Sequence, residues 1–126
     1  MKTTDPDDAL LLAQAARSNG DFAAALEMLR EISRKSPNSV AVLLLLSETF
    51  KELGKMEEAL TTAQKVICLA PRSEIASRLL FHCFWDMGNE EGAFAEITRF
   101  LAISDSKDYR AIIQELSEKR GNKDRP

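Results

Sequence analysis

The stretch Leu53-Gly54-Lys55-Met56-Glu57-Glu58-Ala59-Leu60 decides the fold, because the chain repeats its pattern on either side. Residues 19–26 and residues 87–94 carry the same order, a glycine followed five residues later by an alanine. The glycines stand 34 residues apart, at 20, 54 and 88, and the alanines keep the same step, at 25, 59 and 93. Self-similarity at a fixed period of this length is typical of stacked repeats. The sequence therefore predicts an array of three similar units.

Each unit shows the pattern of two helices joined by a tight turn. Asn19-Gly20 supplies the left-handed residue that ends a first helix, and Gly54 and Gly88 take the same place later. Pro37 and Pro71, also 34 residues apart, stop the second helices of the first two units. The predicted hairpins cover about residues 6–39, 40–73 and 74–105.

Small residues indicate where the two helices of a hairpin approach closely. The recurring alanines lie on the second helix of each pair, and Ala13 and Ser47 take a similar place on the first helices. Phe81 breaks this series in the third unit. We therefore expect the third hairpin to be the least regular.

A last amphipathic segment follows the third hairpin. Its apolar residues fall on one helical face, at Tyr109, Ile112, Ile113 and Leu116. The open end of a repeat array needs a terminal helix with a polar outer side. The sequence predicts this capping helix over about residues 107–120, within one domain of residues 1–121 and before a polar tail of residues 122–126.

Composition and charge exclude several classes of function. The formal net charge of −3 gives no electrostatic reason to bind nucleic acid. The longest apolar run, Val40 to Leu46, is far shorter than the roughly 20 residues that span a bilayer, so no membrane insertion is expected. The polar, acidic start lacks the features of a secretory signal. Cys68 and Cys83 fit no metal or redox spacing and are expected to be buried, reduced thiols in a cytoplasmic protein.

The residues that usually carry catalysis are scarce. His82 is the single histidine, and its neighbour Cys83 points about 100° away from it on a helix. The pairs Glu57-Glu58 and Glu90-Glu91 fall in first turns of helices, where acids favour the helix dipole. Each turn glycine is isolated, so no phosphate-binding loop is present. We expect no enzyme activity, no cofactor and no metal site.

The repeat register, the Gly-x-x-x-x-Ala stretch and the closing prolines resemble the tetratricopeptide repeat. The resemblance covers about residues 6–105 and implies an all-α, right-handed α-solenoid of three helix-turn-helix hairpins with a seventh, capping helix. It also implies a non-enzymatic protein-protein interaction module whose first helices line a concave groove. The chain departs from the family where Ala9, Leu43 and Ser77 replace an early aromatic residue and where Asp105 replaces the last proline.

The resemblance places thirteen residues on the groove wall: Leu10, Leu11, Gln14, Arg17, Leu44, Leu45, Glu48, Lys51, Ile75, Arg78, Leu79, His82 and Trp85. One subgroup of the family grips an acidic C-terminal peptide with a clamp of basic and amide side chains. The matching positions here carry no basic residue, being Leu10, Gln14, Leu45, Ile75 and Leu79. A chaperone-tail function of that kind is therefore not expected.

The groove wall is instead predicted to be apolar. Six residues would form one patch of the size that marks a partner site, namely Leu10, Leu11, Leu44, Leu45, Ile75 and Leu79. The expected partner is a protein with an apolar peptide or an amphipathic helix, which this chain would bind as an adaptor or in a chaperone-like way. Trp85 would be the aromatic anchor, with Arg78 and His82 as polar guides.

Three alternatives remain open at this point. The apolar wall could pair with a second copy of the chain and form a homo-oligomer. It could also be covered internally, for example by the C-terminal helix. A small inhibitor or immunity-type protein would instead use the acidic rim of Glu48, Glu52 and Asp86.

Overall fold

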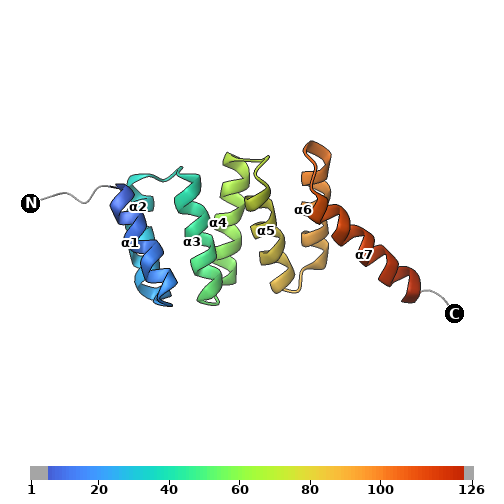
Figure 1. The fold of residues 1–126 in the computed structure, drawn as a ribbon, viewed down its shortest axis with the longest axis horizontal. Helices are drawn as coiled ribbons and strands as arrows, with labels where there is room; N and C mark the ends of the chain where they lie inside the picture. Colours follow the sequence, from blue (N-terminus) through green and yellow to red (C-terminus); the bar gives the residue numbers. More distant parts are fainter. Residues whose placement is uncertain (1–5, 124–126) are drawn as a thin grey trace, which may run out of the picture.

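The computed structural model describes the backbone of residues 6–123 and the side chains of residues 8–119. This part of the chain contains seven α-helices and no strand: α1 (Pro6–Ser18), α2 (Phe22–Lys35), α3 (Val40–Glu52), α4 (Met56–Leu69), α5 (Glu74–Asp86), α6 (Glu90–Ile103) and α7 (Lys107–Lys123). Figure 1 shows α1, α3 and α5 side by side in one layer, with their hairpin partners α2, α4 and α6 behind them. The fold is the all-α repeat array that the 34-residue period predicts.

The hairpin turns form because glycine stands where the backbone turns left-handed. Gly20, Gly54 and Gly88 have φ values of 79°, 76° and 77°. A residue with a Cβ rarely adopts this region, so the three glycines are required by backbone geometry. Asp21 and Asn89 then cap the second helices α2 and α6 by accepting hydrogen bonds from backbone N–H groups.

Serines begin the later first helices in one repeated manner. The Ser39 hydroxyl accepts from the N–H of Val42, and the Ser73 hydroxyl accepts from the N–H of Ala76. Ser106 does the same for Tyr109 at the start of α7. The seventh helix thus begins like the first helix of a further repeat.

Two hydrophobic clusters fill the interior. The first extends from α1 to α5 and is built mainly from aliphatic residues and alanines, with Phe50 and Cys83 among them and with Ala59 and Ala63 fully buried. The second lies at the C-terminal end and contains Phe81, Ala93, Ile97, Phe100 and Tyr109. The three recurring alanines, Ala25, Ala59 and Ala93, are all fully buried, as close helix approach requires.

Phe81 has a definite place in the second cluster. Its ring lies 6.1 Å from that of Tyr109 of α7 and stacks on Trp85 at 5.9 Å, measured between ring centroids. The corresponding Ser47 of α3 donates a hydrogen bond to the backbone oxygen of Ala59, at 2.7 Å. The third repeat therefore replaces a small polar contact with aromatic packing.

The C-terminal helix packs on the array mainly through its first turns. Tyr109 is buried and Ile112 is half-buried, whereas Ile113 on the same predicted face is exposed. Figure 1 shows α7 leaving α6 obliquely toward the C-terminus. The helix also continues to Lys123, past its expected end near residue 120, so the predicted polar tail starts inside it; residues 124–126 lie outside the described residues.

One sequence-based expectation about burial was wrong, and one leucine departs from its repeat register. Cys83 is buried as expected, but Cys68 is exposed, because it lies on the outer side of α4. Leu12 keeps the register of Leu46 and Leu80, yet it is 58% exposed while they are 8% and 5% exposed. Leu46 and Leu80 belong to first helices that follow another repeat, and no described helix precedes α1.

Candidate functional site

The first helices line two adjoining surface hollows. Most of the predicted groove residues surround one hollow of about 290 Å³, which we call the α3–α5 hollow. It is lined by Arg17, Glu48, Lys51, Glu52, Ile75, Arg78, Leu79 and His82. Seven of these eight residues, all except Glu52, are predicted groove residues. The sequence register thus brings together side chains from α1, α3 and α5.

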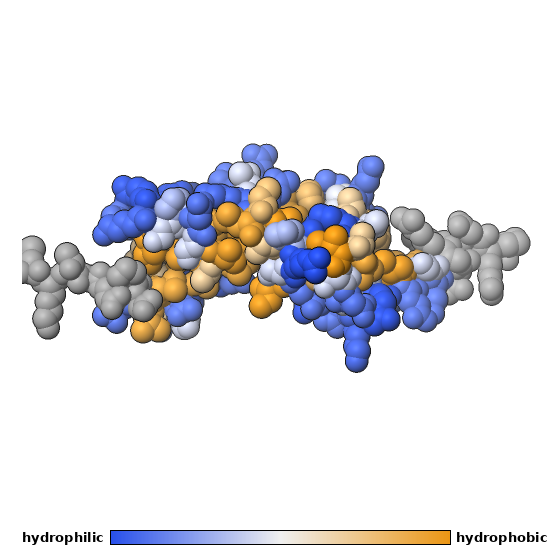
Figure 2. Space-filling view, turned by 90° about the horizontal axis from the view of Figure 1, so that it is seen from above, coloured by the Kyte–Doolittle hydropathy of each residue, from blue (hydrophilic) through white to orange (hydrophobic). Residues whose placement is uncertain are grey.

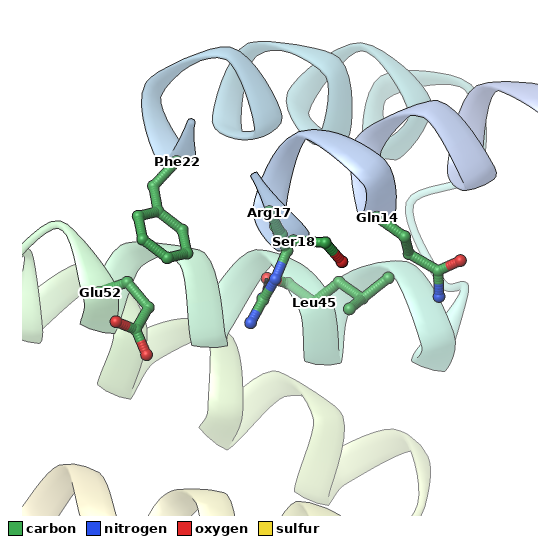
Figure 3. Close-up of a pocket in the computed structure, with 6 residues that line it drawn as sticks. All are labelled: Gln14, Arg17, Ser18, Phe22, Leu45 and Glu52. Atoms are coloured by element: carbon green, nitrogen blue, oxygen red, sulfur yellow. Dashed lines mark hydrogen bonds between the residues drawn. The ribbon is translucent and has the colours of Figure 1, made fainter. Parts of the chain in front are cut away.

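The second hollow, of about 470 Å³, lies between α1 and α3 and is called the α1–α3 hollow. It is lined by Gln14, Arg17, Ser18, Phe22, Leu45 and Glu52. Figure 3 shows Arg17 reaching from α1 toward α3, with Phe22 and Glu52 toward one end and Gln14 toward the other. Arg17 and Glu52 line both hollows, so the two hollows adjoin, and together we call them the groove.

Arg17 joins the first two repeats. Its Nη1 atom donates to the backbone oxygen of Leu45 and to Oγ1 of Thr49, both at 3.1 Å. Its Nη2 atom lies 3.4 Å from Oε2 of Glu48. With three partners on α3, the guanidinium holds α1 against α3 and has little freedom left for a ligand.

Two further ion pairs cross from one first helix to the next. Lys51 Nζ lies 3.2 Å from Oδ2 of Asp86, and Arg78 Nη1 lies 3.2 Å from Oδ2 of Asp108. Pairs as exposed as these are typically worth only about 0–1 kcal/mol, so a charged ligand can exchange with them. They also neutralise much of the acidic rim, because Glu48 and Asp86 each have a basic partner.

His82 lies in the α3–α5 hollow with its ring edge-on to Phe81, at 5.3 Å between centroids. Partial burial lowers the pKa of His82, and the charges of Lys51 and Arg78 lower it further, while Asp86 raises it. The imidazole is therefore neutral at pH 7. It can donate one hydrogen bond and accept another.

The apolar wall is smaller than the sequence suggested. Leu79 is only 7% exposed and belongs to the core, and Leu10, Leu44 and Leu45 are partly buried against it. Ile75 is 67% exposed, and Leu11 is exposed as well. Figure 2 shows apolar and hydrophilic side chains interspersed along the array. Four of the six expected wall residues therefore turn wholly or partly inward, and the groove combines a narrow apolar floor with charged sides.

Four predicted residues lie outside both linings: Leu10, Leu11, Leu44 and Trp85. Trp85 is partly exposed but packs its ring between Phe81 and Phe94. The sequence analysis missed two lining residues, Ser18 and Phe22, and named Glu52 only as part of the acidic rim and not as a groove residue. Ser18 and Glu52 stand 34 residues apart beside Arg17 and Lys51, so the repeat register already contained a signal for them.

The described residues contain no group of three or more His, Cys, Asp or Glu side chains that could hold a metal ion. Within the same part of the chain, no helix is both long enough and apolar enough to cross a membrane.

Fold and repeat register together define a tetratricopeptide-repeat protein. The TPR domain of Sgt2 from Aspergillus fumigatus superposes with a TM-score of 0.77 at 16% identity, covering 98% of this chain and 84% of that one. A crystal structure of MamA gives 0.71 at 22% identity over 79% of this chain and 54% of that one. A MamA mutant gives 0.72 at 17% identity, with 82% and 76% covered. This chain therefore spans between about half and three quarters of those MamA chains.

The family can be stated more narrowly. The model of the family described as "Anaphase-promoting complex, cyclosome, subunit 3" matches residues 1–66, just over half of the chain, and the chain belongs to this family. No curated protein matches the sequence.

Proposed function

We propose that this chain is a non-enzymatic protein-interaction module that binds an amphipathic peptide or helix of a partner protein in the groove of α1, α3 and α5. The observation that carries the proposal is the convergence of seven predicted groove residues around the α3–α5 hollow. Their side chains offer both kinds of contact that an amphipathic segment needs. Ile75 and Leu79 provide the apolar floor, and the charged residues provide the sides.

The family and the fold support this reading. The matching family takes its description from a subunit of a multi-protein complex. The Sgt2 domain and MamA carry the same fold on proteins that differ strongly in sequence, so the fold alone does not select the partner. An adaptor or chaperone-like role in the cytoplasm is our working assignment. The two free thiols, Cys68 and Cys83, suit a reducing compartment of that kind.

The test is a selection of peptides on the wild-type chain, followed by binding measurements on two matched variants. Ile75→Asn alters the groove at an exposed position, so the fold should be retained. Leu12→Asn makes the same type of change at an exposed position that lines neither hollow. Selected peptides should lose about tenfold or more in affinity with Ile75→Asn, the size of effect expected from losing a buried aliphatic contact.

The Leu12→Asn variant should bind like the wild type. Equal binding to all three proteins would place the peptides outside the groove and would overturn the proposal. Native mass spectrometry of the same samples tests the alternative of self-association, in which the unliganded chain would already be a stable dimer.

A further inference from the structure

We propose that the α3–α5 hollow is a subsite for an acidic side chain of the bound segment, held by Lys51, Arg78 and His82 beside an apolar residue of the same segment. The inference rests on the proposed function and adds the chemistry of the ligand. Its three donors stand at positions other than the five of the family's known clamp, and those five positions carry no basic residue here.

The three donors come from two neighbouring helices and border one space. Lys51 lies on α3, and Arg78 and His82 lie one helical turn apart on α5. All three line the 290 Å³ hollow together with Ile75 and Leu79. A carboxylate entering between α3 and α5 would therefore meet two cations and one ring N–H, with aliphatic surface next to them.

The anions of the lining do not cancel these donors. Glu48 pairs with Arg17, which is bound to α3 by two further hydrogen bonds. Glu52 also lines the α1–α3 hollow, and it lies toward Phe22 in Figure 3. The remaining competitors are Asp86 on Lys51 and Asp108 on Arg78, both in exposed ion pairs that an incoming carboxylate can replace.

The charges around His82 show which sign of ligand the hollow favours. Lys51 and Arg78 both lower the pKa of His82, and the effect of Lys51 exceeds the opposing effect of Asp86. The lining of the hollow carries three cations, Arg17, Lys51 and Arg78, against two anions, Glu48 and Glu52. This balance favours a negatively charged side chain over a positive one.

The experiment uses two blocked dipeptides as probes, N-acetyl-Leu-Glu-amide and its isosteric control N-acetyl-Leu-Gln-amide. His82 is the only histidine of the chain, so its imidazole signals in an NMR titration are unambiguous. The Glu probe should shift those signals and raise the pKa of His82. By linkage, its affinity should increase as the pH falls from 8 through the pKa of His82 in the complex. The Gln probe should leave the pKa of His82 unchanged, and its binding should not depend on pH.

Two variants move the affinity in opposite directions. Arg78→Gln removes a half-exposed cation and should weaken the Glu probe about threefold or more, whereas Arg30→Gln, an equally exposed change on α2, should leave it unchanged. Asp86→Asn frees Lys51 and should tighten binding of the Glu probe, a gain that misfolding cannot produce. Equal responses to the Glu and Gln probes, or an unaltered affinity in Asp86→Asn, would overturn the subsite.

The two proposals fail in different ways. Selected peptides that are sensitive to Ile75→Asn but contain no acidic residue would leave the groove function standing and remove the acidic subsite. If the Glu probe binds but no selected peptide is sensitive to Ile75→Asn, the acidic subsite stands and the proposed groove function falls.

Discussion

The middle hairpin and the C-terminal end of the array have the same helical register but different interiors. Between α3 and α4 the contact is made by small residues, with Ser47 bonded to the backbone of Ala59. Between α5, α6 and α7 the space is filled by Phe81, Phe100 and Tyr109. The comparison shows that the 34-residue period sets the positions at which helices pack on one another. The side chains at those positions set the direction in which the next helix runs.

A buried polar network accompanies the aromatic packing. Ser77 Oγ donates to Glu96 Oε2 at 2.5 Å and lies 2.7 Å from the hydroxyl oxygen of Tyr109. Arg99 binds both carboxylate oxygens of Glu96 at 2.7 Å. Glu96 is only 4% exposed, and burial of a charge is tolerated only when it is paired in this way. One repeat earlier, the corresponding Thr62 bonds only within its own helix.

The largest effect is expected where the two interiors differ most. Phe81→Ala should lower the free energy of unfolding by about 3–5 kcal/mol, because it removes a buried ring that contacts both α5 and α7. Ser47→Ala, the matched change in the middle repeat, should cost only about 1 kcal/mol, for one lost hydrogen bond. Urea denaturation followed by circular dichroism measures both. Similar costs at the two positions would mean that the aromatic cluster does not carry the C-terminal end.

A smaller effect should follow from breaking the buried network. Glu96→Ala should cost about 2–3 kcal/mol, below the usual range for a buried pair because Arg99 is partly exposed and can turn to water. Thr62→Ala at the corresponding position should stay within about 0.5 kcal/mol. Thermal melting of the two variants makes this comparison. An equal loss for Thr62→Ala would contradict the special role of the C-terminal network.

The last effect is absent at neutral pH and should appear only at alkaline pH. Burial raises the pKa of Tyr109 to about 12, despite the hydrogen bond with Ser77, which lowers it. An unfolded tyrosine releases its proton near pH 10, so stability from the neutral phenol is present below that pH and lost as pH rises toward 12. The loss per pH step is at most about 1.4 kcal/mol.

Tyr109 is the only tyrosine of the chain, so phenolate absorbance in the near ultraviolet follows it directly. Phenolate should appear near pH 12 in the folded protein and about two pH steps lower in urea. The Tyr109→Phe variant should show a flatter alkaline limb in its stability profile. A folded-state titration near pH 10 would indicate that α7 does not shield this residue.

Much of the fold could be predicted from the sequence, because the recurring glycines and alanines mark backbone turns and close helix contacts that depend on local geometry alone. A positive φ at Gly54 and a close helix approach at Ala59 leave few other choices of residue. The course of α7 could not be predicted in this way. Ile112 and Ile113 mark an apolar face, but the angle at which that face meets α6 depends on Phe81 and Tyr109, which lie far apart in sequence.

The sequence predicted which residues lie near the groove better than it predicted how exposed and how apolar the groove is. The family resemblance placed Ile75, Arg78 and His82 on the groove side of α5, and the three side chains line one hollow. Spacing could not distinguish Leu79, which turns into the core, from Ile75, which stays exposed. A rotation of a few tens of degrees about the helix axis separates the two outcomes, and only packing against α3 and α4 sets that rotation. Which residues bind a partner stays a prediction.

The two proline-containing loops are each bound by a cation from the second helix of the repeat that follows. Lys65 of α4 donates to the backbone oxygen of Pro37 at 2.9 Å, and Arg99 of α6 donates to that of Pro71 at 3.0 Å. Both partners of the second bond lie 34 residues after those of the first. The unit of growth for this architecture is therefore self-contained. A repeat duplicated in frame would bind the loop before it with its own cation and have its own loop bound by the repeat after it, so the array can be lengthened by copying without redesigning a junction.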